Sequence, residues 1–368
     1  MRILLVDLES SWRGGQSQAL LLLQGLLARG HSVELLSAQG AALAQRAQSE
    51  NIPVSAISNS LRRARAAGRI RTLLRDPGFD VVHANEAHAL TAAWLAGAHR
   101  RATLVTARRV AFPLGTSALS RARYRAARRI IAISRFVAQS VVDSGVPARR
   151  VEVVYDGVEI PPPSSPDANM AASKAARCAA RERWGVPEGQ PLLGCVGYLL
   201  PEKGQEFLLR ALPEIRARFP ACRLLLAGDG PCRARLERIA TDLSIQSAVH
   251  FAGHVQNVSE AYAALDVFVF PSLAEPLGSS LLAAMAAGLP VIAVASGGVP
   301  EVVEEGAGLL LPDPNPAGIA EAAVRLLSNP SMAASLGQTA RKIIQQKFSA
   351  DRMVESTLQA YEQAGAGG

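Results

Sequence analysis

The chain has 368 residues, of which 49% are hydrophobic and 19% are charged, and its net charge is +8. This length suits two globular domains better than one, and the apolar content excludes an intrinsically disordered protein. The four cysteines lack metal-ligand or disulfide spacing, and the chain opens on an apolar strand rather than a signal peptide. Both features predict a cytoplasmic protein.

Strands and helices alternate through the first half of the chain. Such alternation predicts βαβ units and a parallel sheet. Short apolar runs predict strands at 3–6, 32–37, 54–57, 81–84, 103–106, 130–132 and 151–154. Helices are expected at 17–29, 41–50, 61–74, 87–96 and 135–144, with a loop at Gly14 and Gly15 before the first of them.

The alternation restarts after a Pro- and Ser-rich segment at 161–166, which we expect to be a rigid, exposed spacer. After a connecting helix, strands are expected at 192–197, 223–227, 249–251, 267–270, 291–295 and 309–311, with helices between them. The sequence therefore predicts an α/β protein with two doubly wound domains, residues 1–160 and 161–349. A last helix near 350–364 is expected to cross back, so that residues 350–368 complete the first domain.

Basic residues are concentrated in the first domain. Residues 62–129 contain fifteen arginines and only three acidic residues. A nucleic-acid partner is not favoured, because base-stacking aromatic residues are few and no DNA- or RNA-binding signature is present. Two interpretations stay open: solvated helix faces, or a surface that meets anionic lipid headgroups or an anionic acceptor.

The stretch from Glu275 to Glu301 combines a carboxylate, a glycine turn, an apolar helix, an apolar strand and a second glycine turn. Residues 281–287 suit a buried helix and residues 291–295 a buried strand. The N-terminus of this helix offers backbone N–H groups to an anion, and Gly278 lets a ligand approach closely. A carboxylate at the mouth of such a loop predicts a ligand with both phosphate and hydroxyl groups.

Two other glycine-containing loops suit an anionic ligand. Gly14 and Gly15 open a helix, where backbone N–H groups can bind phosphate, although a tight turn explains them equally well. Lys203 lies in the turn after the strand at 192–197 and can neutralise a diphosphate leaving group. Its alternative is an ordinary exposed loop lysine.

Three residues of the first domain are candidates on the acceptor side. His83 is expected at the end of a strand, where it is either a structural residue or a ligand. Arg108 and Arg109 follow the strand at 103–106. They either hold an anionic group or belong to the basic face.

The motifs, taken in order, resemble those of the family-4 retaining glycosyltransferases with the GT-B fold. The resemblance implies two Rossmann-like domains that face a central cleft, with the acceptor bound by the first domain and the donor by the second. It also implies metal-independent sugar transfer from a nucleotide sugar, with retention of the anomeric configuration. The matching segments span nearly the whole chain: R-G-G, L-L-A-R-G-H, D-V-V-H-A-N, A-I-S-R-F-V, V-V-Y-D-G-V-E, P-E-K-G, A-G-D-G-P, D-V-F-V-F-P-S-L-A-E-P-L-G-S-S and G-G-V-P-E-V-V.

The resemblance further implies roles for individual residues. Gly14 and Gly15 would lie near the donor phosphates, Lys203 would pair with the diphosphate, and Glu275 would contact the donor sugar hydroxyls. No metal and no cofactor is expected beyond the nucleotide-sugar co-substrate, for which a UDP-sugar is favoured. The positions whose backbone would bind phosphate and sugar are Gly278, Ser279 and Ser280.

Three positions depart from the family pattern. The second glutamate of the usual Glu-x7-Glu motif, which binds the ribose hydroxyls, is Ala283, a loss of about 1–3 kcal/mol of binding. The usual arginine two residues after Val196 is Tyr198 on the donor side, which leaves Lys203 alone against the diphosphate. A frequent histidine is replaced by Arg108, and we expect Arg108 or Arg109 to supply the missing positive charge from across the cleft.

The sequence therefore predicts a hexosyl-type glycosyltransferase that acts on a glycan or lipid-linked acceptor in cell-envelope polysaccharide, lipopolysaccharide or glycolipid synthesis. The basic first domain suits a peripheral position at the inner membrane face. One alternative is a non-catalytic relative that binds a nucleotide or glycan as a partner subunit, which Ala283 and Tyr198 favour. Another is a different enzyme of this two-domain fold, such as a sugar-nucleotide epimerase. Detectable sugar transfer or donor hydrolysis would distinguish the active glycosyltransferase from the non-catalytic relative.

Overall fold

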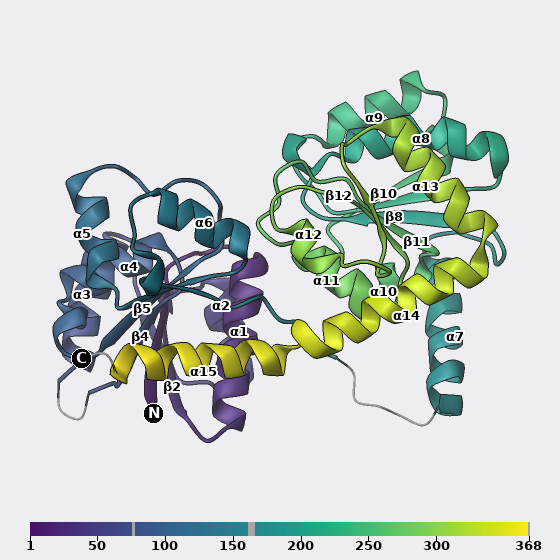
Figure 1. The fold of residues 1–368 in the computed structure, drawn as a ribbon. Helices are drawn as coiled ribbons and strands as arrows, with labels where there is room; N and C mark the ends of the chain where they lie inside the picture. The colour runs from purple at the N-terminus through teal and green to yellow at the C-terminus, as the bar shows by residue number, and fades with distance from the viewer. Residues whose placement is uncertain (76–77, 161–165, 367–368) are drawn as a thin grey trace. The chain divides into compact units, whose positions relative to one another are not determined.

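The fold is taken from a computed structural model that describes residues 1–75, 78–160 and 166–366, without the side chains of 166–173. The chain forms two compact units, each built on one parallel sheet (Figure 1). Unit 1 comprises Met1–Gly157 and Phe348–Gly368, and unit 2 comprises Val158–Lys347. The prediction of two Rossmann-like parallel sheets is confirmed. The spacer expected at 161–166 lies, apart from its last residue, outside the described residues.

The sheet of unit 1 has the order β3-β2-β1-β4-β5-β6-β7, with parallel neighbours throughout. The chain winds outward from β1 to β3, then returns to place β4 on the other side of β1. The strand order therefore reverses between β1 and β4. The strands are β1 (Arg2–Asp7), β2 (Ser32–Ala38), β3 (Val54–Ile57), β4 (Val81–Ala84), β5 (Thr103–Arg108), β6 (Arg129–Ala132) and β7 (Val151–Val153).

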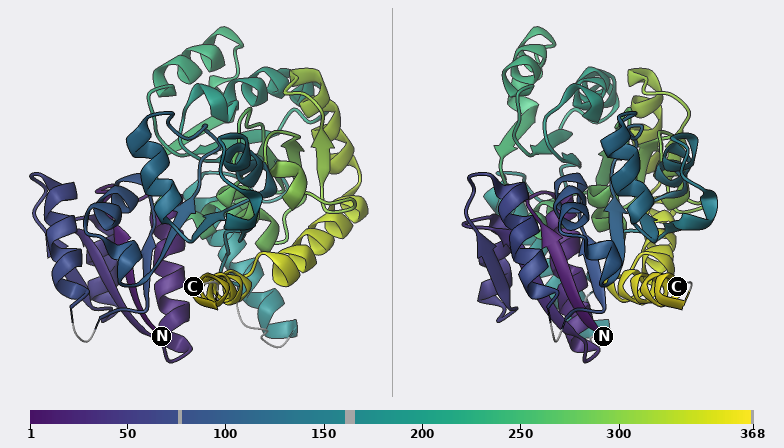
Figure 2. Two further views of the ribbon diagram at one scale, coloured as in Figure 1. Left: turned by 60° about the vertical axis from the view of Figure 1, so that its left-hand side comes forward. Right: turned by 90° about the vertical axis from the view of Figure 1, so that its left-hand side faces the viewer.

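Helices cover both faces of this sheet (Figures 1 and 2). The alternation of β1 shows why, since Leu4 and Val6 belong to a core with α3, α4 and α5, while Ile3 and Leu5 belong to a core with α1, α2 and α15. The described helices are α1 (Gly14–Ala28), α2 (Ala42–Ser49), α3 (Arg62–Leu73), α4 (Ala87–Leu95), η1 (Ala98–Arg100), α5 (Ala118–Ala126), α6 (Arg135–Asp143), η2 (Ala148–Arg150) and α15 (Ala350–Ala366).

Two local expectations for unit 1 need correction. The loop predicted at Gly14 and Gly15 is wrong, because α1 begins at Gly14. Glycine is tolerated there because the first-turn N–H groups of a helix have no intrahelical partner to lose. The helix α5 falls in a segment for which the sequence predicts no element. Its pattern is mostly alanine and arginine, and only Ser120 and Tyr124 of its residues are buried.

The C-terminal helix α15 packs on unit 1 beside α1 (Figure 2). Gly25 of α1 makes this close approach possible, because a Cβ there would lie 2.4 Å from Cγ2 of Val354. Farther along the helix, the Tyr361 hydroxyl lies 2.7 Å from Nδ1 of His83 in β4. Both side chains are 1% exposed. His83 is therefore held inside the unit by the helix that closes it.

This buried histidine predicts a pH dependence of the stability of unit 1. Burial, with a smaller contribution from the Arg109 charge, lowers the pKa of His83 from 6.5 to about 3. The unfolded chain then binds a proton below pH 6.5 that the folded chain does not. The contribution of His83 to the free energy of unfolding is thus fully present above pH 6.5 and is lost as the pH falls toward 3. Between pH 7 and pH 5 the loss amounts to about 2 kcal/mol.

The measurement is urea unfolding in a Trp184→Phe background, where the remaining tryptophans, Trp12 and Trp94, both report on unit 1. The same protein with His83→Gln should show a smaller loss of unfolding free energy between pH 7 and pH 5. The difference between the two proteins separates the effect of His83 from that of Glu86. Burial raises the pKa of Glu86 to about 7, so the stabilisation that Glu86 contributes is lost as the pH rises from 4.5 to 7. Equal losses in the two proteins would contradict the assignment.

The sheet of unit 2 has the order β10-β9-β8-β11-β12-β13, again with parallel neighbours. Its strand order reverses between β8 and β11. The strands are β8 (Leu192–Val196), β9 (Arg223–Ala227), β10 (Val249–Gly253), β11 (Val267–Phe270), β12 (Val291–Val294) and β13 (Leu309–Leu311).

Helices again pack on both faces of the sheet. Val267 and Val269 of β11 join the core with α8, α9 and α13, while Phe268 between them faces the other way and contacts the ring of Tyr262 in α10. The described helices are α7 (Pro166–Arg183), η3 (Pro201–Lys203), α8 (Gln205–Arg218), α9 (Arg233–Asp242), η4 (Gln246–Ala248), α10 (Val258–Ala264), α11 (Ser279–Ala286), α12 (Val299–Val302), α13 (Pro316–Ser328) and α14 (Pro330–Lys347). None of the helices in the described residues combines the length and apolarity needed to span a bilayer.

Candidate functional site

The candidate site of unit 2 lies where its strand order reverses. In open parallel sheets, ligands bind beyond the carboxyl ends of the strands at such a switch point. The loop after β8 leads into η3, which ends at Lys203, and the loop after β11 carries Glu275. The topology thus brings together two charged residues that are 72 positions apart in the chain.

Lys203 and Glu275 form an ion pair. Nζ of Lys203 donates to Oε2 of Glu275 at 2.6 Å, and the Ser272 hydroxyl donates to the same oxygen at 3.1 Å. The Glu275 side chain is 9% exposed and the Lys203 side chain 27%. Among the described residues, Oε1 of Glu275 accepts no hydrogen bond. The carboxylate is therefore held through one oxygen and can accept a ligand hydroxyl at the other.

Tight backbone contacts fix the two loops relative to each other. Gly204, at φ 68°, follows Lys203, and a Cβ there would lie 2.1 Å from the Pro271 carbonyl oxygen. The Leu273 N–H donates to the Glu202 carbonyl at 2.7 Å. On the far side, the Gly298 N–H donates to the Glu275 carbonyl at 2.9 Å. The position of the ion pair is thus set by the backbone as well as by the strands.

The N-terminus of α11 begins three residues after Glu275. Gly278 is its N-cap at φ 108°, and no side chain caps the helix. Ser279 is exposed and Ser280 half-buried. Uncapped N–H groups at a helix start attract anions, so the segment from Glu275 to Ser280 offers a carboxylate and an anion-binding backbone, and Lys203 of the neighbouring loop adds a cation. Ala283 lies one turn farther along α11 and is half-buried.

Tyr198 lies in the loop after β8 and is 56% exposed. Its carbonyl oxygen accepts a hydrogen bond from Nε2 of the buried Gln205 at 3.1 Å, so the backbone is anchored while the ring is exposed. The structure therefore places Tyr198 in the same loop as Lys203 without giving its ring a packing role.

The switch point of unit 1 holds a polar cluster that the sequence analysis missed. Asp7 ends β1 and is fully buried, and its Oδ2 accepts from Nδ2 of Asn85 at 2.7 Å and from Nε2 of Gln16 at 3.0 Å. Burial raises the pKa of Asp7. Asn85 also reaches the Gly15 carbonyl at 3.4 Å, while its own Oδ1 is buried without a partner in the described residues. The available signal was that Asp7 ends β1 and Asn85 directly follows β4, the two strands between which the order reverses.

The acceptor-side candidates are placed differently from one another. His83 lies inside β4 rather than at its end, and its burial against Tyr361 favours the structural interpretation. Arg109 forms an ion pair with Asp156, which is 9% exposed, and its Cδ would be 3.3 Å from a Cβ at Gly15. Arg108 is the last residue of β5 and donates to the Phe112 carbonyl.

One group of side chains in the described part of the chain could hold a metal ion. Ligand atoms of Glu9, Glu86 and His88 lie within 4.8 Å of one another. Glu86, however, caps α4 by accepting from the backbone N–H groups of His88 and Ala89. Burial raises its pKa to about 7, which weakens binding of a cation at neutral pH.

Comparisons with known proteins agree with this architecture. Residues 12–160 match the family model described as Glycosyltransferase Family 4, and residues 177–343 match the one described as Glycosyl transferases group 1. Together the two matches support a family-4-type glycosyltransferase. The first match lies almost entirely within unit 1 and the second lies within unit 2, while residues 1–11, 161–176 and 344–368 lie outside both.

Curated relatives match parts of this chain. It is 32% identical over 238 residues to an uncharacterized glycosyltransferase of Methanocaldococcus jannaschii, covering 64% of this chain and 60% of the relative. It is 36% identical over 190 residues to a GDP-mannose-dependent alpha-(1-6)-phosphatidylinositol monomannoside mannosyltransferase of Mycolicibacterium smegmatis, covering 49% and 50%. The matched region thus spans only about half to three fifths of these relatives' length.

Solved structures match this chain over almost its full length. Anabaena HepE in complex with UDP and glucose has a TM-score of 0.83 at 22% identity, covering 98% of this chain and 99% of that one. A glycosyltransferase of Rickettsia africae has a TM-score of 0.82 at 19% identity, covering 99% and 98%. At these identities the likeness shows the fold, and the prediction of the GT-B fold is confirmed.

Proposed function

We propose that this protein transfers a hexosyl group from a nucleotide sugar to a glycan or lipid-linked acceptor, with retention of configuration and without a metal. The observation that carries the proposal is the Lys203–Glu275 pair beside the uncapped N-terminus of α11. The two family-model matches support it, as do relatives whose names include mannosyltransferases and a structural neighbour in complex with UDP and glucose. A UDP-sugar is the favoured donor.

In this proposal unit 2 binds the donor. Lys203 pairs with the diphosphate and stabilises the charge that develops as the sugar–phosphate bond breaks. Glu275 accepts hydrogen bonds from donor sugar hydroxyls. The backbone of Gly278, Ser279 and Ser280 binds phosphate and sugar. The leaving phosphate assists the acceptor hydroxyl on the same face of the sugar, so no enzyme nucleophile is required.

Unit 1 is proposed to bind the acceptor, with Gly14 and Gly15 at the start of α1 near the donor phosphates. The cellular role we propose is cell-envelope polysaccharide or glycolipid synthesis, in the cytoplasm and peripherally at the inner membrane face. The many arginines of unit 1 support contact with an anionic surface.

The direct test is calorimetric titration of the purified protein with UDP, GDP and ADP, followed by their sugar conjugates. We expect one nucleotide to bind with a micromolar dissociation constant, and slow release of free sugar from the matching donor. The Glu275→Ala variant should bind the nucleotide as the wild type does, but it should lose the additional affinity that the sugar gives the nucleotide-sugar conjugate. Absence of binding by all three nucleotides would overturn the donor site.

A second candidate is a non-catalytic relative that binds a nucleotide or glycan as a partner subunit. Two observations favour it: Ala283 stands where a ribose-binding carboxylate is usual, and Tyr198 where an arginine is usual. Nucleotide binding without transfer or donor hydrolysis would support this candidate over the enzyme.

Arg108 is proposed as a further catalytic cation. Its Nε is buried without a hydrogen-bond partner in the described residues, at the carboxyl end of β5. Arg109 is the weaker candidate, because its charge is already paired with Asp156. We expect Arg108→Ala to lower turnover about tenfold or more through loss of one charge-assisted contact. Full turnover together with full donor affinity in this variant would end the assignment.

A further inference from the structure

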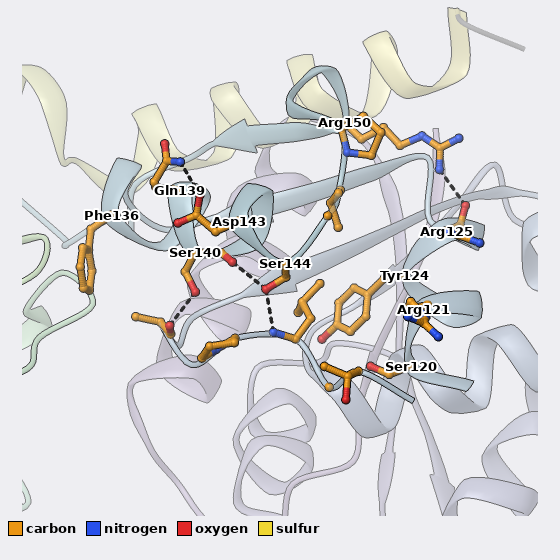
Figure 3. Close-up of a pocket in the computed structure, with 18 residues that line it drawn as sticks. Ser120, Arg121, Tyr124, Arg125, Phe136, Gln139, Ser140, Asp143, Ser144 and Arg150 are labelled. Atoms are coloured by element: carbon orange, nitrogen blue, oxygen red, sulfur yellow. Dashed lines mark hydrogen bonds between the residues drawn. The ribbon is translucent and has the colours of Figure 1, made fainter. Parts of the chain in front are cut away.

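Unit 1 contains a cavity of about 920 Å³, and none of the residues assigned above to sugar transfer line it. It lies between α5, α6 and the two loops that precede α5 and follow α6 (Figure 3). This volume is at the upper end of the range for ligand pockets. Neither Asp7 nor Asn85 lines it, so the cavity is distinct from the polar cluster at the switch point of the sheet.

The walls of the cavity are fastened together by hydrogen bonds. The Ser144 hydroxyl accepts from the Leu114 N–H at 2.9 Å and donates to the Ser140 carbonyl at 2.8 Å. The Ser140 hydroxyl donates to the Ala111 carbonyl at 2.6 Å. The loop before α5 is therefore tied to α6, and the cavity is a built feature of the fold rather than a gap beside a loose loop.

The interior of the cavity is mainly apolar but carries one unsatisfied polar group. Leu114, Tyr124, Val146 and Pro147 contribute hydrocarbon surface. Ser120 of α5 also lines the cavity, is 5% exposed, and has a hydroxyl without a hydrogen-bond partner in the described residues. A buried hydroxyl without a partner favours a ligand that brings a polar atom.

Positive charge is gathered at one end of the cavity. Figure 3 shows Arg121, Arg125 and Arg150 on the same side, away from Asp143. Arg150 donates to the Arg125 carbonyl at 2.8 Å, which holds its guanidinium at that end. In the described part of the chain no carboxylate forms an ion pair with any of the three arginines. A guanidinium cluster of this kind suits a phosphate group.

Large apolar side chains are exposed next to the cavity. Phe112, in the loop before α5, is 75% exposed, and Leu119, in the first turn of α5, is 52% exposed. Each precedes a lining residue directly in the chain. Apolar side chains beside cationic ones are typical of surfaces that receive amphiphilic molecules.

We propose that this cavity binds a single phosphorylated lipid, with its hydrocarbon chain against Leu114, Tyr124 and Val146 and its phosphate at Arg121, Arg125 and Arg150. The inference rests on the proposed function, in which such a lipid is the anchor of a lipid-linked acceptor. Charge complementarity decides for an anionic rather than a neutral lipid. The volume of the cavity and its mainly apolar lining favour one inserted molecule rather than only the surface of a bilayer.

The experiment is calorimetric titration of the full chain with monododecyl phosphate below its micelle concentration. We expect saturable binding of one molecule per chain. Dodecyl maltoside, which has the same tail without the charge, should bind at least about tenfold more weakly, and inorganic phosphate should give no measurable binding. Equal affinity for the two dodecyl compounds would overturn the role of the arginines.

Two variants locate the site, and a third serves as control. The double variant Arg121→Gln/Arg125→Gln should weaken the binding of monododecyl phosphate at least about tenfold and leave the binding of dodecyl maltoside unchanged. Val146→Trp, which fills the cavity, should weaken both compounds. The control Arg63→Gln/Arg101→Gln removes two exposed charges of the same unit that do not line the cavity, and it should bind like the wild type. Circular dichroism establishes that each variant is folded.

Vesicles of phosphatidylcholine with and without phosphatidylglycerol identify the competing explanation. If anionic vesicles bind and both double variants weaken this binding equally, while monododecyl phosphate does not bind, the arginines form a general basic surface and the cavity inference fails. Titration with UDP, GDP and ADP in the same samples separates this result from the donor site. If a nucleotide binds and monododecyl phosphate does not, only the cavity inference is contradicted. If monododecyl phosphate binds and no nucleotide does, only the donor site is contradicted.

Discussion

Replacing Lys203 with methionine is expected to lower kcat/KM for donor turnover by about 10²–10³-fold, the usual effect of removing one preorganised group that stabilises developing charge. Lys203 is the one cation that the structure shows paired with Glu275 at the switch point of unit 2, and methionine keeps the length of the side chain without its charge. The readout is release of nucleoside diphosphate and free sugar from the donor identified by calorimetry.

The matched control is Lys347→Met. Lys347 also forms a 2.6 Å ion pair with a glutamate of unit 2, Glu304, but both side chains are more exposed and lie outside the switch-point loops. This variant should retain full turnover, because an exposed pair contributes at most about 1 kcal/mol. Similar losses in both lysine variants would indicate a general effect on unit 2 and contradict the assigned role.

A double variant separates two ways in which Lys203 can act. If its charge meets the diphosphate directly, Lys203→Met should lower turnover further in a Glu275→Gln background. If it only orients the carboxylate, the double variant should be no worse than Glu275→Gln alone. We expect the first result, since Ser272 also donates to Glu275 and helps to hold the carboxylate without the lysine.

Gly204→Ala is expected to damage both the stability of unit 2 and its activity. An alanine would adopt φ 68° at a cost of about 1–2 kcal/mol. Its Cβ would also lie 2.1 Å from the Pro271 carbonyl oxygen, a backbone atom that cannot swing away. Relief requires the loop carrying Glu275 to shift from Lys203. The expected losses are about 2–4 kcal/mol of stability and about 10²-fold in turnover.

Gly185→Ala is the control for this prediction. Gly185 also lies in unit 2 with a positive φ of 60°, but a Cβ there would meet nothing within 4 Å. This variant should lose only the stability that the positive φ costs an alanine, about 1–2 kcal/mol, and it should keep its activity. Thermal unfolding followed by Trp184 fluorescence and donor turnover at 25 °C measure the two effects. Equal behaviour of the two glycine variants would show that the contact with Pro271 does not matter.

The sequence predicted the architecture well because the architecture depends on the apolar runs that mark strands and on the order in which strands and helices alternate. The strands β3, β4, β9, β11 and β13 have the bounds that their apolar runs predict. Alternating elements then require parallel sheets, and the confirmed fold follows from right-handed crossovers of ordinary length. Lys203 and Glu275 were singled out for the same reason: each follows a strand, and strand ends of a parallel sheet meet at one edge.

Other features depend on packing that one sequence does not display. The Asp7–Gln16–Asn85 cluster exists because β1 and β4 become neighbours, an adjacency that strand predictions leave open. The helix α5 shows little apolar periodicity, since Ser120 and Tyr124 are its only buried residues and both also line the cavity. The sequence left His83 open between a structural residue and a ligand, because its buried partner, Tyr361, is 278 residues away.

The return of α15 to unit 1 has a consequence for biosynthesis. Residues 348–366 leave the ribosome after all of unit 2, yet they supply Met353, Val354 and Tyr361 to the core that faces α1 and α2. Until α15 has been synthesised, that core is missing one wall and its apolar surface is open to water and to other chains. A premature stop shortly after residue 347, before α15 is made, would therefore leave unit 2 complete, while unit 1, which was synthesised first, could not complete its core.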